Sequence, residues 1–275
     1  MVHTCNKSCS TSPRDAAKLC DGFCQFFKDK LEKIADTVAT CLSNAPGYHQ
    51  QASKRQEPRL LDELALVTVD EVVKLVRSLP SKSSPDDDMP TTMLKSNVDV
   101  MAPLITRLVN MSFSYGVFPS SLKQGPVTPL LKKPGLDQFD MASYRPITNL
   151  STMSKILKKL ALQLLQPYMM STGNFSEFQS VYRAGHSTET ALLKVINDVI
   201  TSTCDRLTTV LLSLDISAAF DTIDHNILLD RIFSDFGICG SALGWLQSFV
   251  TGRYQYVAIG AQKSLQTICA YGVTG

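Results

Sequence analysis

An aspartate at the end of an apolar run is the feature of this sequence with the clearest chemical meaning. The stretch Thr208–His225 reads TTVLLSLDISAAFDTIDH, and the apolar residues from Val210 to Leu214 predict a buried central strand that ends at Asp215. A carboxylate at the end of a buried strand is costly unless a cation, a proton or a helix terminus neutralises it. Among these partners we favour a divalent metal ion.

The segment LDISAAFDTIDHNILLDRI resembles the first catalytic block of the reverse transcriptases of LINE-type, non-LTR retrotransposons. In that block a strand-end aspartate is followed five residues later by an aromatic residue, and Asp215 and Phe220 stand in these positions. Three further segments resemble the preceding blocks, in the order of the family: SFSYGVFPSSLKQGPVTPLLKKPG, SYRPITNLSTMSKILKKL and FQSVYRAGHSTETALLKVINDVI. The resemblance covers roughly residues 60–275.

The resemblance implies an α+β fold with the fingers and an incomplete palm of a right-hand polymerase. We expect a helical leader and linker at residues 1–58, a fingers-like region at 59–207 and a partial palm at 208–275. The implied function is that of an RNA-directed DNA polymerase. Its implied partners are an RNA template, a DNA primer and deoxynucleoside triphosphates.

The implied cofactor is Mg²⁺, since two such ions can activate the primer hydroxyl, stabilise the phosphate undergoing transfer and hold the pyrophosphate. Magnesium takes hard oxygen ligands. Asp215 is expected to supply one carboxylate, and the backbone carbonyl of Ile216 a second ligand. The resemblance places Phe220 under the sugar of the incoming nucleotide, where it would select deoxynucleotides, and we expect Asp221 to support the turn.

Basic residues are candidates for contacts with phosphates. By resemblance, Lys132 or Lys133, before a hairpin turn, and Arg145, on the return arm, contact the incoming triphosphate, whose charge requires several donors. Arg183 and His186 precede a helix N-terminus, where backbone donors and the dipole favour an anion, so a template phosphate is the natural ligand. Exposed charges without such a role are the alternative for both groups.

Two other charged groups have plainer interpretations. The cluster Lys155, Lys158 and Lys159 is typical of a solvated helix face. Three consecutive acids, Asp86 to Asp88, lie in the Pro-bounded stretch SKSSPDDDMP, which favours a solvated loop over a metal site. A catalytic role for His225 is also disfavoured, because this residue opens a helix beside a capping Asp224.

The elements that must position these residues are mostly helices. Apolar periodicity and capping residues predict helices at 15–43, 69–79, 91–95, 99–115, 155–169, 191–200, 225–236 and 241–250. Thr68 and Glu71 form a capping box, and Gly237 ends the helix that Asp224 caps. Residues 125–131 predict a strand that Pro126 and Pro129 confine to a sheet edge. Residues 253–259 and 265–270 predict a hairpin.

Composition limits the class of protein. The chain has 275 residues, 44% of them hydrophobic, and a net charge of +2, so it is globular and any nucleic-acid contact depends on local basic clusters. Five of its eight cysteines fall in the first 41 residues, but the spacings CNKSC and CDGFC do not match zinc knuckles, which favours free thiols. We expect an intracellular protein, in the cytoplasm and nucleus, without a signal peptide or a membrane span.

The second half of the expected metal site is not in the sequence. No adjacent pair of aspartates follows Asp215. One carboxylate does not hold two metal ions, so we expect a truncated polymerase domain that is inactive by itself. The alternatives are a non-catalytic transposon relic that binds RNA weakly and, less favoured because Ser217 replaces the required second aspartate, a phosphatase of the haloacid dehalogenase type.

Overall fold

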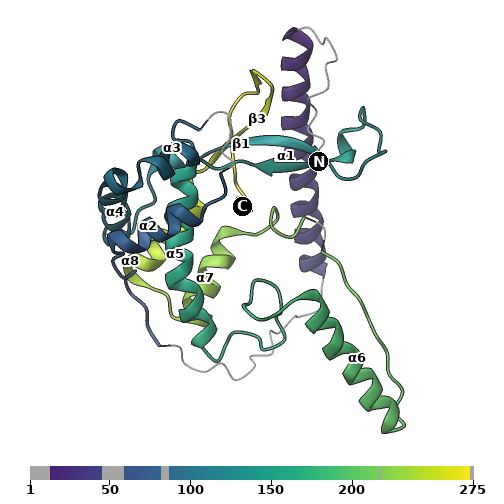
Figure 1. Ribbon diagram of the computed structural model, residues 1–275. Coiled ribbons are helices and arrows are strands. Elements are labelled where there is room, and N and C mark those ends of the chain that lie inside the picture. The colour runs from purple at the N-terminus through teal and green to yellow at the C-terminus, as the bar shows by residue number, and fades with distance from the viewer. Residues whose placement is uncertain (1–12, 45–58, 82–86, 217, 273–275) are drawn as a thin grey trace.

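The protein is described here by a computed structural model, which covers residues 13–44, 59–81, 87–216 and 218–272. Figure 1 shows a helical lobe, built around the long helix α5, beside a small sheet that helix α1 crosses. Helix α6 extends away from the helical lobe and from the sheet (Figure 1). The mixture of helices and sheet is that of the predicted α+β class.

The helical lobe contains the larger of two hydrophobic cores. Its core joins the buried faces of α2, α4, α5 and α8, and includes Val76, Phe113, Leu157 and Trp245. The helices of the chain are α1 (Pro13–Asn44), α2 (Val69–Ser78), α3 (Thr91–Ser96), α4 (Val98–Ser114), α5 (Thr152–Ser171), α6 (Thr188–Cys204), α7 (His225–Phe236) and α8 (Gly240–Val250). None of the helices among the described residues is long and apolar enough to cross a membrane.

Local signals in the sequence determine where several helices begin and end. The Thr68 hydroxyl accepts a hydrogen bond from the Glu71 amide, and the Glu71 carboxylate accepts one from the Thr68 amide, which confirms the predicted capping box. Asp224 caps α7 by accepting from the amides of Asn226 and Ile227. Gly237 ends that helix in the left-handed conformation, with φ of 67°, as predicted.

The sheet brings together strands that are far apart in the sequence. Strand β1 (Gln124–Leu131) pairs antiparallel with β2 (Tyr144–Thr148) and parallel with β3 (Tyr254–Ile259). Strand β3 also pairs antiparallel with β4 (Gln262–Lys263) and β5 (Thr267–Ile268). Both predicted hairpins are therefore present.

The prediction that β1 is an edge strand is wrong, because β1 has a neighbour on each side. Pro129 is tolerated inside the sheet by its position in the ladder. Pro129 lies opposite Pro146, so neither residue needs an N–H at that position. The parallel pairing with β3 ends at Val127, before Pro129 is reached.

Helix α1 packs on the sheet and forms the second hydrophobic core with it. Cys20, Phe23 and Phe27 of α1 are buried against Val127, Tyr144 and Val257 of the strands. The rings of Phe23 and Tyr144 meet edge to face at 5.0 Å. The expected helix is confirmed, and it belongs to the folded body.

Substituting Phe23 by alanine is expected to lower the free energy of unfolding by about 3 kcal/mol, because a buried ring is lost and a cavity remains. The Phe23 side chain is only 3% exposed. Urea denaturation followed by circular dichroism measures the change, with Gln25→Ala, on the exposed face of α1, as the control that should stay within about 0.5 kcal/mol of the parent. Equal stability of the two variants would mean that α1 does not dock on the sheet in solution.

The predicted buried strand before Asp215 is wrong. Residues 207–216 form no regular secondary structure, and Val210 and Leu214 are 86% and 81% exposed. A strand needs a neighbouring strand for its backbone hydrogen bonds, and none of the described strands pairs with this segment. The apolar run therefore remains extended and exposed, although its composition favours a buried strand.

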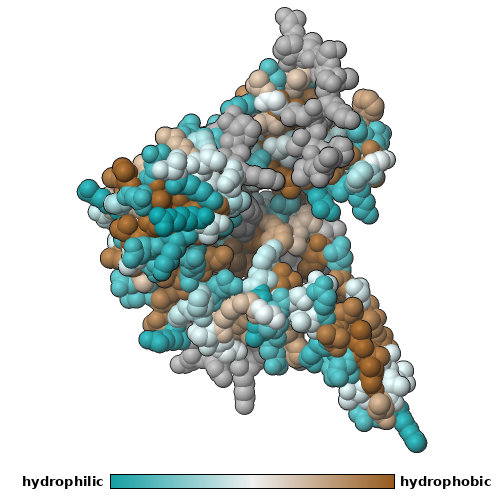
Figure 2. Space-filling model, in the orientation of Figure 1, coloured by the Kyte–Doolittle hydropathy of each residue, from teal (hydrophilic) through white to brown (hydrophobic). Residues whose placement is uncertain are grey.

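Helix α6 shows the same discrepancy. Its sequence is amphipathic, but none of its described side chains is buried, and Leu192, Leu193 and Ile200 are each more than half exposed. Figure 2 shows the resulting hydrophobic stripe along the extended helix. The predicted apolar face is present, but none of the described residues buries it.

The acidic turn before α3 is more structured than expected. Asp87 is buried, so the prediction of a solvated loop is wrong for this residue. Its carboxylate accepts hydrogen bonds from the Thr152 amide at 2.7 Å and the Thr152 hydroxyl at 2.6 Å. Asp87 thereby ties the turn to the start of α5, while Asp86 lies outside the described residues.

Candidate functional site

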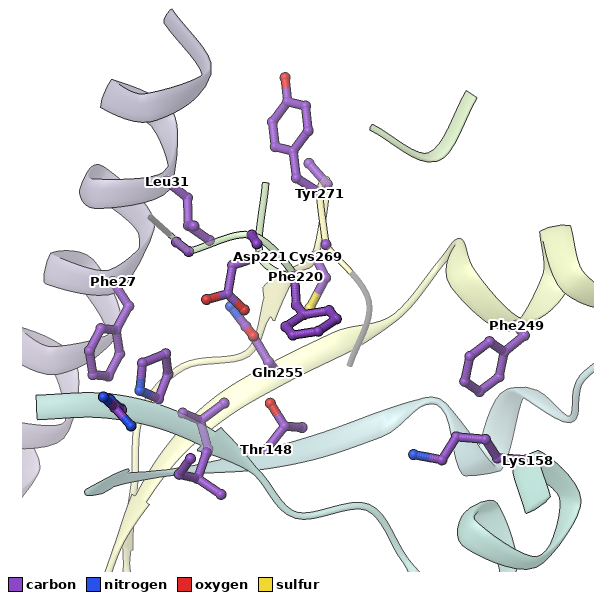
Figure 3. A pocket seen from close by; sticks show the side chains of 18 of the residues that line it. Phe27, Leu31, Thr148, Lys158, Phe220, Asp221, Phe249, Gln255, Cys269 and Tyr271 are labelled. Atoms are coloured by element: carbon purple, nitrogen blue, oxygen red, sulfur yellow. The ribbon is translucent and has the colours of Figure 1, made fainter. Parts of the chain in front are cut away.

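A cavity of about 1520 Å³ lies between the sheet, α1, α5, α8 and the segment that follows residue 214. In Figure 3, Phe27 and Leu31 of α1 lie at one end and Lys158 and Phe249 at the other, with Phe220 and Asp221 between them. Residues from all four sequence blocks line this cavity, including Lys132, Arg145, Lys158, Tyr182, Asp215 and Phe220.

Of the three basic candidates of the β1–β2 hairpin, the structure places two at the cavity and one outside its lining. Lys132 and Arg145 line the cavity, while Lys133 is not among its lining residues. The Lys132 ammonium donates a hydrogen bond to the carbonyl of Ala142 at 2.6 Å, across the hairpin loop. Arg145 is exposed in β2, opposite Leu130 of β1, and its guanidinium has no hydrogen bond or ion pair to any described residue.

The loop before α6 reaches the cavity through an aromatic residue. Tyr182 lines the cavity and meets the Phe220 ring edge to face at 6.5 Å. Arg183 and His186 do not line it: Arg183 donates to the carbonyl of Glu177, and the His186 ring contacts the carbonyl of Ala184. Ser187 caps α6, as predicted, with its hydroxyl accepting from the Thr190 amide. The template-binding roles of Arg183 and His186 stay predictions.

Asp215 and Ile216 lie in the exposed segment, and both line the cavity. Asp221 lines it as well and is partly buried. Burial raises the pKa of the Asp221 carboxyl above its ordinary value, and the charge of Lys30 on α1 opposes that rise. An N-terminal lysine is thus a neighbour of the carboxylate that follows Phe220, a relation that no local sequence signal indicates.

The described residues by themselves do not form a cage for Mg²⁺. The ion prefers several oxygen ligands in octahedral geometry. Asp215 and Asp221 bring carboxylates to the cavity, but nowhere in the described part of the chain do three acidic, histidine or cysteine side chains converge as a metal site. The assignment of Asp215 and Ile216 as metal ligands stays a prediction.

The turn that carries Phe220 and Asp221 is held by the segment after β5. The His225 ring is buried, and its Nε2 donates to the carbonyl of Gly272 at 2.7 Å. The Gly272 amide donates to the carbonyl of Ile223 at 2.9 Å. A Cβ atom on Gly272, whose φ is 84°, would lie 2.9 Å from the Asp221 backbone, so only glycine permits this approach. These contacts are consistent with the structural role expected for His225.

Lys158 is a cavity residue that the sequence did not reveal. The expectation of a solvated helix face is wrong for it, since its side chain lines the cavity and points inward (Figure 3). Burial and, to a smaller extent, the charge of Arg253 lower the pKa of Lys158. Lys158 lies on the same face of α5 as the buried Ser154, one helical turn earlier, and this burial is visible only in the structure.

Comparison with known proteins gives one matching family model. Residues 131–274, slightly more than half of the chain, match the model described as reverse transcriptase (RNA-dependent DNA polymerase). The match begins at the end of β1, so it contains Arg145, Lys158, Asp215 and Phe220. It leaves the first four helices, α1 to α4, outside, although α1 contributes to the cavity.

Similar curated proteins include three from Drosophila melanogaster. The "Probable RNA-directed DNA polymerase from transposon BS" is 26% identical over 98% of this chain and 30% of its own length. The "RNA-directed DNA polymerase from mobile element jockey" is 27% identical over 92% of this chain and 28% of its own length. The "Probable RNA-directed DNA polymerase from transposon X-element" is 29% identical over 72% and 22%. The chain thus spans less than a third of the length of these relatives.

Proposed function

The chain belongs to the reverse transcriptase (RNA-dependent DNA polymerase) family, and from this premise we propose that it is part of the RNA-directed DNA polymerase of a non-LTR retrotransposon. In this proposal the cavity receives an RNA template paired with a DNA primer and the incoming deoxynucleoside triphosphate. The similarity to the transposon BS, jockey and X-element proteins supports this proposal.

The observation that carries the proposal is the convergence of separate sequence blocks on one cavity. Arg145 comes from the β1–β2 hairpin, Tyr182 from the loop before α6, and Asp215 and Phe220 from the segment after it. A large pocket on which a few polar groups from separate segments converge is the usual place for a ligand site. The cavity has both the cations and the aromatic rings that a nucleotide requires.

The proposed roles follow the chemistry of the lining residues. Arg145, with Lys132 or Lys133, contacts the triphosphate, because several donors are needed to offset its charge. Phe220 lies beside the sugar, and its contact with Tyr182 fixes one edge of the ring. Arg183 and His186 contact a template phosphate near the N-terminus of α6.

Reverse transcriptases generally use a divalent metal ion, and Mg²⁺ is the proposed one. When bound, it supplies a positive charge that stabilises the transferring phosphate. Asp215 and the Ile216 carbonyl are the proposed contributors from this chain. The proposed regions are the leader and linker at 1–58, the fingers at 59–207 and part of the palm at 208–275.

Binding of an RNA–DNA hybrid tests the proposal. A fluorescent poly(rA)/oligo(dT) hybrid, titrated with the chain over a range of salt concentrations, is expected to bind with an affinity that falls as salt increases, because phosphate contacts release counterions. The variant Arg183→Ala with His186→Ala, which removes the proposed template contacts, should weaken binding and reduce the salt slope by about one, for the lost guanidinium contact. Fluorescence anisotropy measures both quantities.

The matched control is Lys74→Ala, which removes an exposed lysine of α2 that does not line the cavity. It should leave the slope unchanged. Hybrid binding that is insensitive to salt, or equal in the double variant and the control, would remove the support for a template site beside this cavity.

A further inference from the structure

Beside the Lys158 end of the cavity lie three cations without an acidic partner. They are Lys123 just before β1, Lys158 on α5 and Arg253 just before β3, and within the described residues none of them forms an ion pair. Their charges influence one another: in addition to burial, the charge of Arg253 lowers the pKa of both lysines. Positive charge is therefore concentrated at the Lys158 end of the cavity, where these side chains are partly desolvated.

Arg253 is the most unusual member of this group. Its side chain is 1% exposed, its Nη1 donates to the Phe249 carbonyl at 2.8 Å, and its Nε and Nη2 have no hydrogen-bond partner. The guanidinium also lies against the rings of Phe249 and Phe118, with distances to the ring centroids of 4.8 and 5.6 Å. A buried charge with unpaired donors is costly, and aromatic faces offset only part of that cost.

The two unpaired donors are on the same edge of the guanidinium. The N–H bonds of Nε and Nη2 run side by side, and this edge binds two oxygens of one carboxylate or phosphate. The opposite nitrogen, Nη1, is already occupied by the Phe249 carbonyl. The structure thus leaves free the pair of donors that recognises an oxyanion.

A second unpaired polar atom lies on the neighbouring helix. The Ser154 side chain is completely buried, and its Oγ has no hydrogen-bond partner. Lys158 follows one turn later on the same face of α5 and extends into the cavity (Figure 3). Phe249, which contacts Arg253, and Cys269, whose amide donates to the Arg253 carbonyl, both line the cavity. Arg253 therefore lies directly behind the cavity wall at the Lys158 end.

We propose that Lys158 and Arg253 form a binding site for a phosphate group, with Ser154 as an additional donor. The phosphate enters from the cavity past Lys158 and is held by the free edge of Arg253. A phosphate dianion balances two of the three positive charges, which an internal water molecule would not do. The site deepens the function proposed above, because the phosphate can come from the backbone of a nucleic-acid strand or from a nucleoside triphosphate.

Thermal unfolding in the presence of orthophosphate tests the site without any polymerase substrate. A ligand that binds only the folded state raises the melting temperature. For a chain of this size, phosphate at ten times its dissociation constant should raise the melting temperature by about 2–3 °C relative to chloride at equal ionic strength. Arg253→Met and Lys158→Met should each reduce this shift to less than about 1 °C, whereas Lys159→Met, on the same helix but outside the cavity lining, should retain it.

Arg253→Met has a further expected effect that excludes simple misfolding. Because it replaces a buried unpaired charge with an apolar side chain of similar length, its melting temperature in chloride should equal or exceed that of the parent. Ser154→Ala provides a milder second variant, expected to weaken phosphate binding about threefold to tenfold through the loss of one hydrogen bond. A shift that is absent in the parent, or that persists in both Met variants, would overturn the site.

Two more ligands identify the source of the phosphate. A shift with dTTP that requires Arg253 assigns the site to the nucleotide, and a shift with the RNA–DNA hybrid that requires Arg253 assigns it to the strand backbone. An Arg253-dependent response to orthophosphate alone would retain the phosphate site and count against the polymerase function. If the parent shows no Arg253-dependent response to orthophosphate but still binds the hybrid in a salt-dependent way, the phosphate site is rejected and the proposed function stands.

Discussion

Substituting Trp245 by alanine is expected to lower the free energy of unfolding by about 4 kcal/mol, a large share of the 5–15 kcal/mol typical of a folded domain. The side chain is 2% exposed and lies in the core of the helical lobe. Its ring meets those of Phe113 and Phe118 edge to face and stacks on Phe249, each with centroids 5.6 Å apart. Alanine leaves a cavity that three aromatic neighbours cannot close without moving.

Trp245→Phe separates the packing of the ring from its hydrogen bond. The indole Nε1 donates to the Ser112 hydroxyl at 2.9 Å, while that hydroxyl donates to the Val117 carbonyl at 2.7 Å. Phenylalanine keeps most of the ring contacts and loses one hydrogen bond, so the expected cost is about 1–2 kcal/mol. Urea denaturation at a constant m-value measures both variants. A loss below about 1 kcal/mol for Trp245→Ala would show that this aromatic cluster does not organise the lobe.

The elements that the sequence predicts well are those with local causes. The Thr68–Glu71 capping box and the Asp224–Gly237 pair depend on residues within one helix, and both are confirmed. The periodicity of α1 predicts a helix, which is also confirmed. That α1 packs on β3 and lines the cavity depends on tertiary contacts, which no periodicity reveals.

The wrong predictions concern elements whose state depends on a partner. An apolar run such as Val210–Leu214 favours a strand, but a strand forms only where another strand offers hydrogen bonds. The prolines of β1 suggested an edge strand, whereas the register with β2 and β3 leaves room for Pro129 inside the sheet. In both cases the pairing between distant segments decides the outcome.

The candidate site was predicted in part. The structure brings Lys132, Arg145, Asp215 and Phe220 to one cavity, as a common site requires, and leaves Lys133, Arg183 and His186 outside its lining. Lys158 and Arg253 were missed because their setting depends on burial from other elements. Arg253 lies on the same strand face as Gln255 and Val257, and a face that carries an arginine and a glutamine gives no sign in the sequence that it points inward.

Asp215 has the largest expected effect on catalysis. Asp215 lines the cavity, on the same segment as Phe220. Among the described residues no group of three potential metal ligands could replace it. Removal of a carboxylate that supports the charge of a reacting phosphate costs several kcal/mol, and about 4 kcal/mol corresponds to a loss of roughly a thousandfold in rate.

Primer extension by a chimeric polymerase is the most direct test of the proposed function. In the chimera, these residues replace the matching segment of the Drosophila melanogaster jockey polymerase, which is 27% identical to them. With poly(rA)/oligo(dT) and Mg²⁺, we expect incorporation of dTMP that falls at least about a thousandfold in Asp215→Ala and is unchanged in Asp205→Ala, a control at the exposed end of α6. The 275-residue chain assayed alone should incorporate nothing, since no adjacent aspartate pair follows Asp215 in its sequence. Equal incorporation by the Asp215→Ala and Asp205→Ala chimeras would contradict the account. So would a chimera that retains Asp215 and binds the hybrid but incorporates no dTMP.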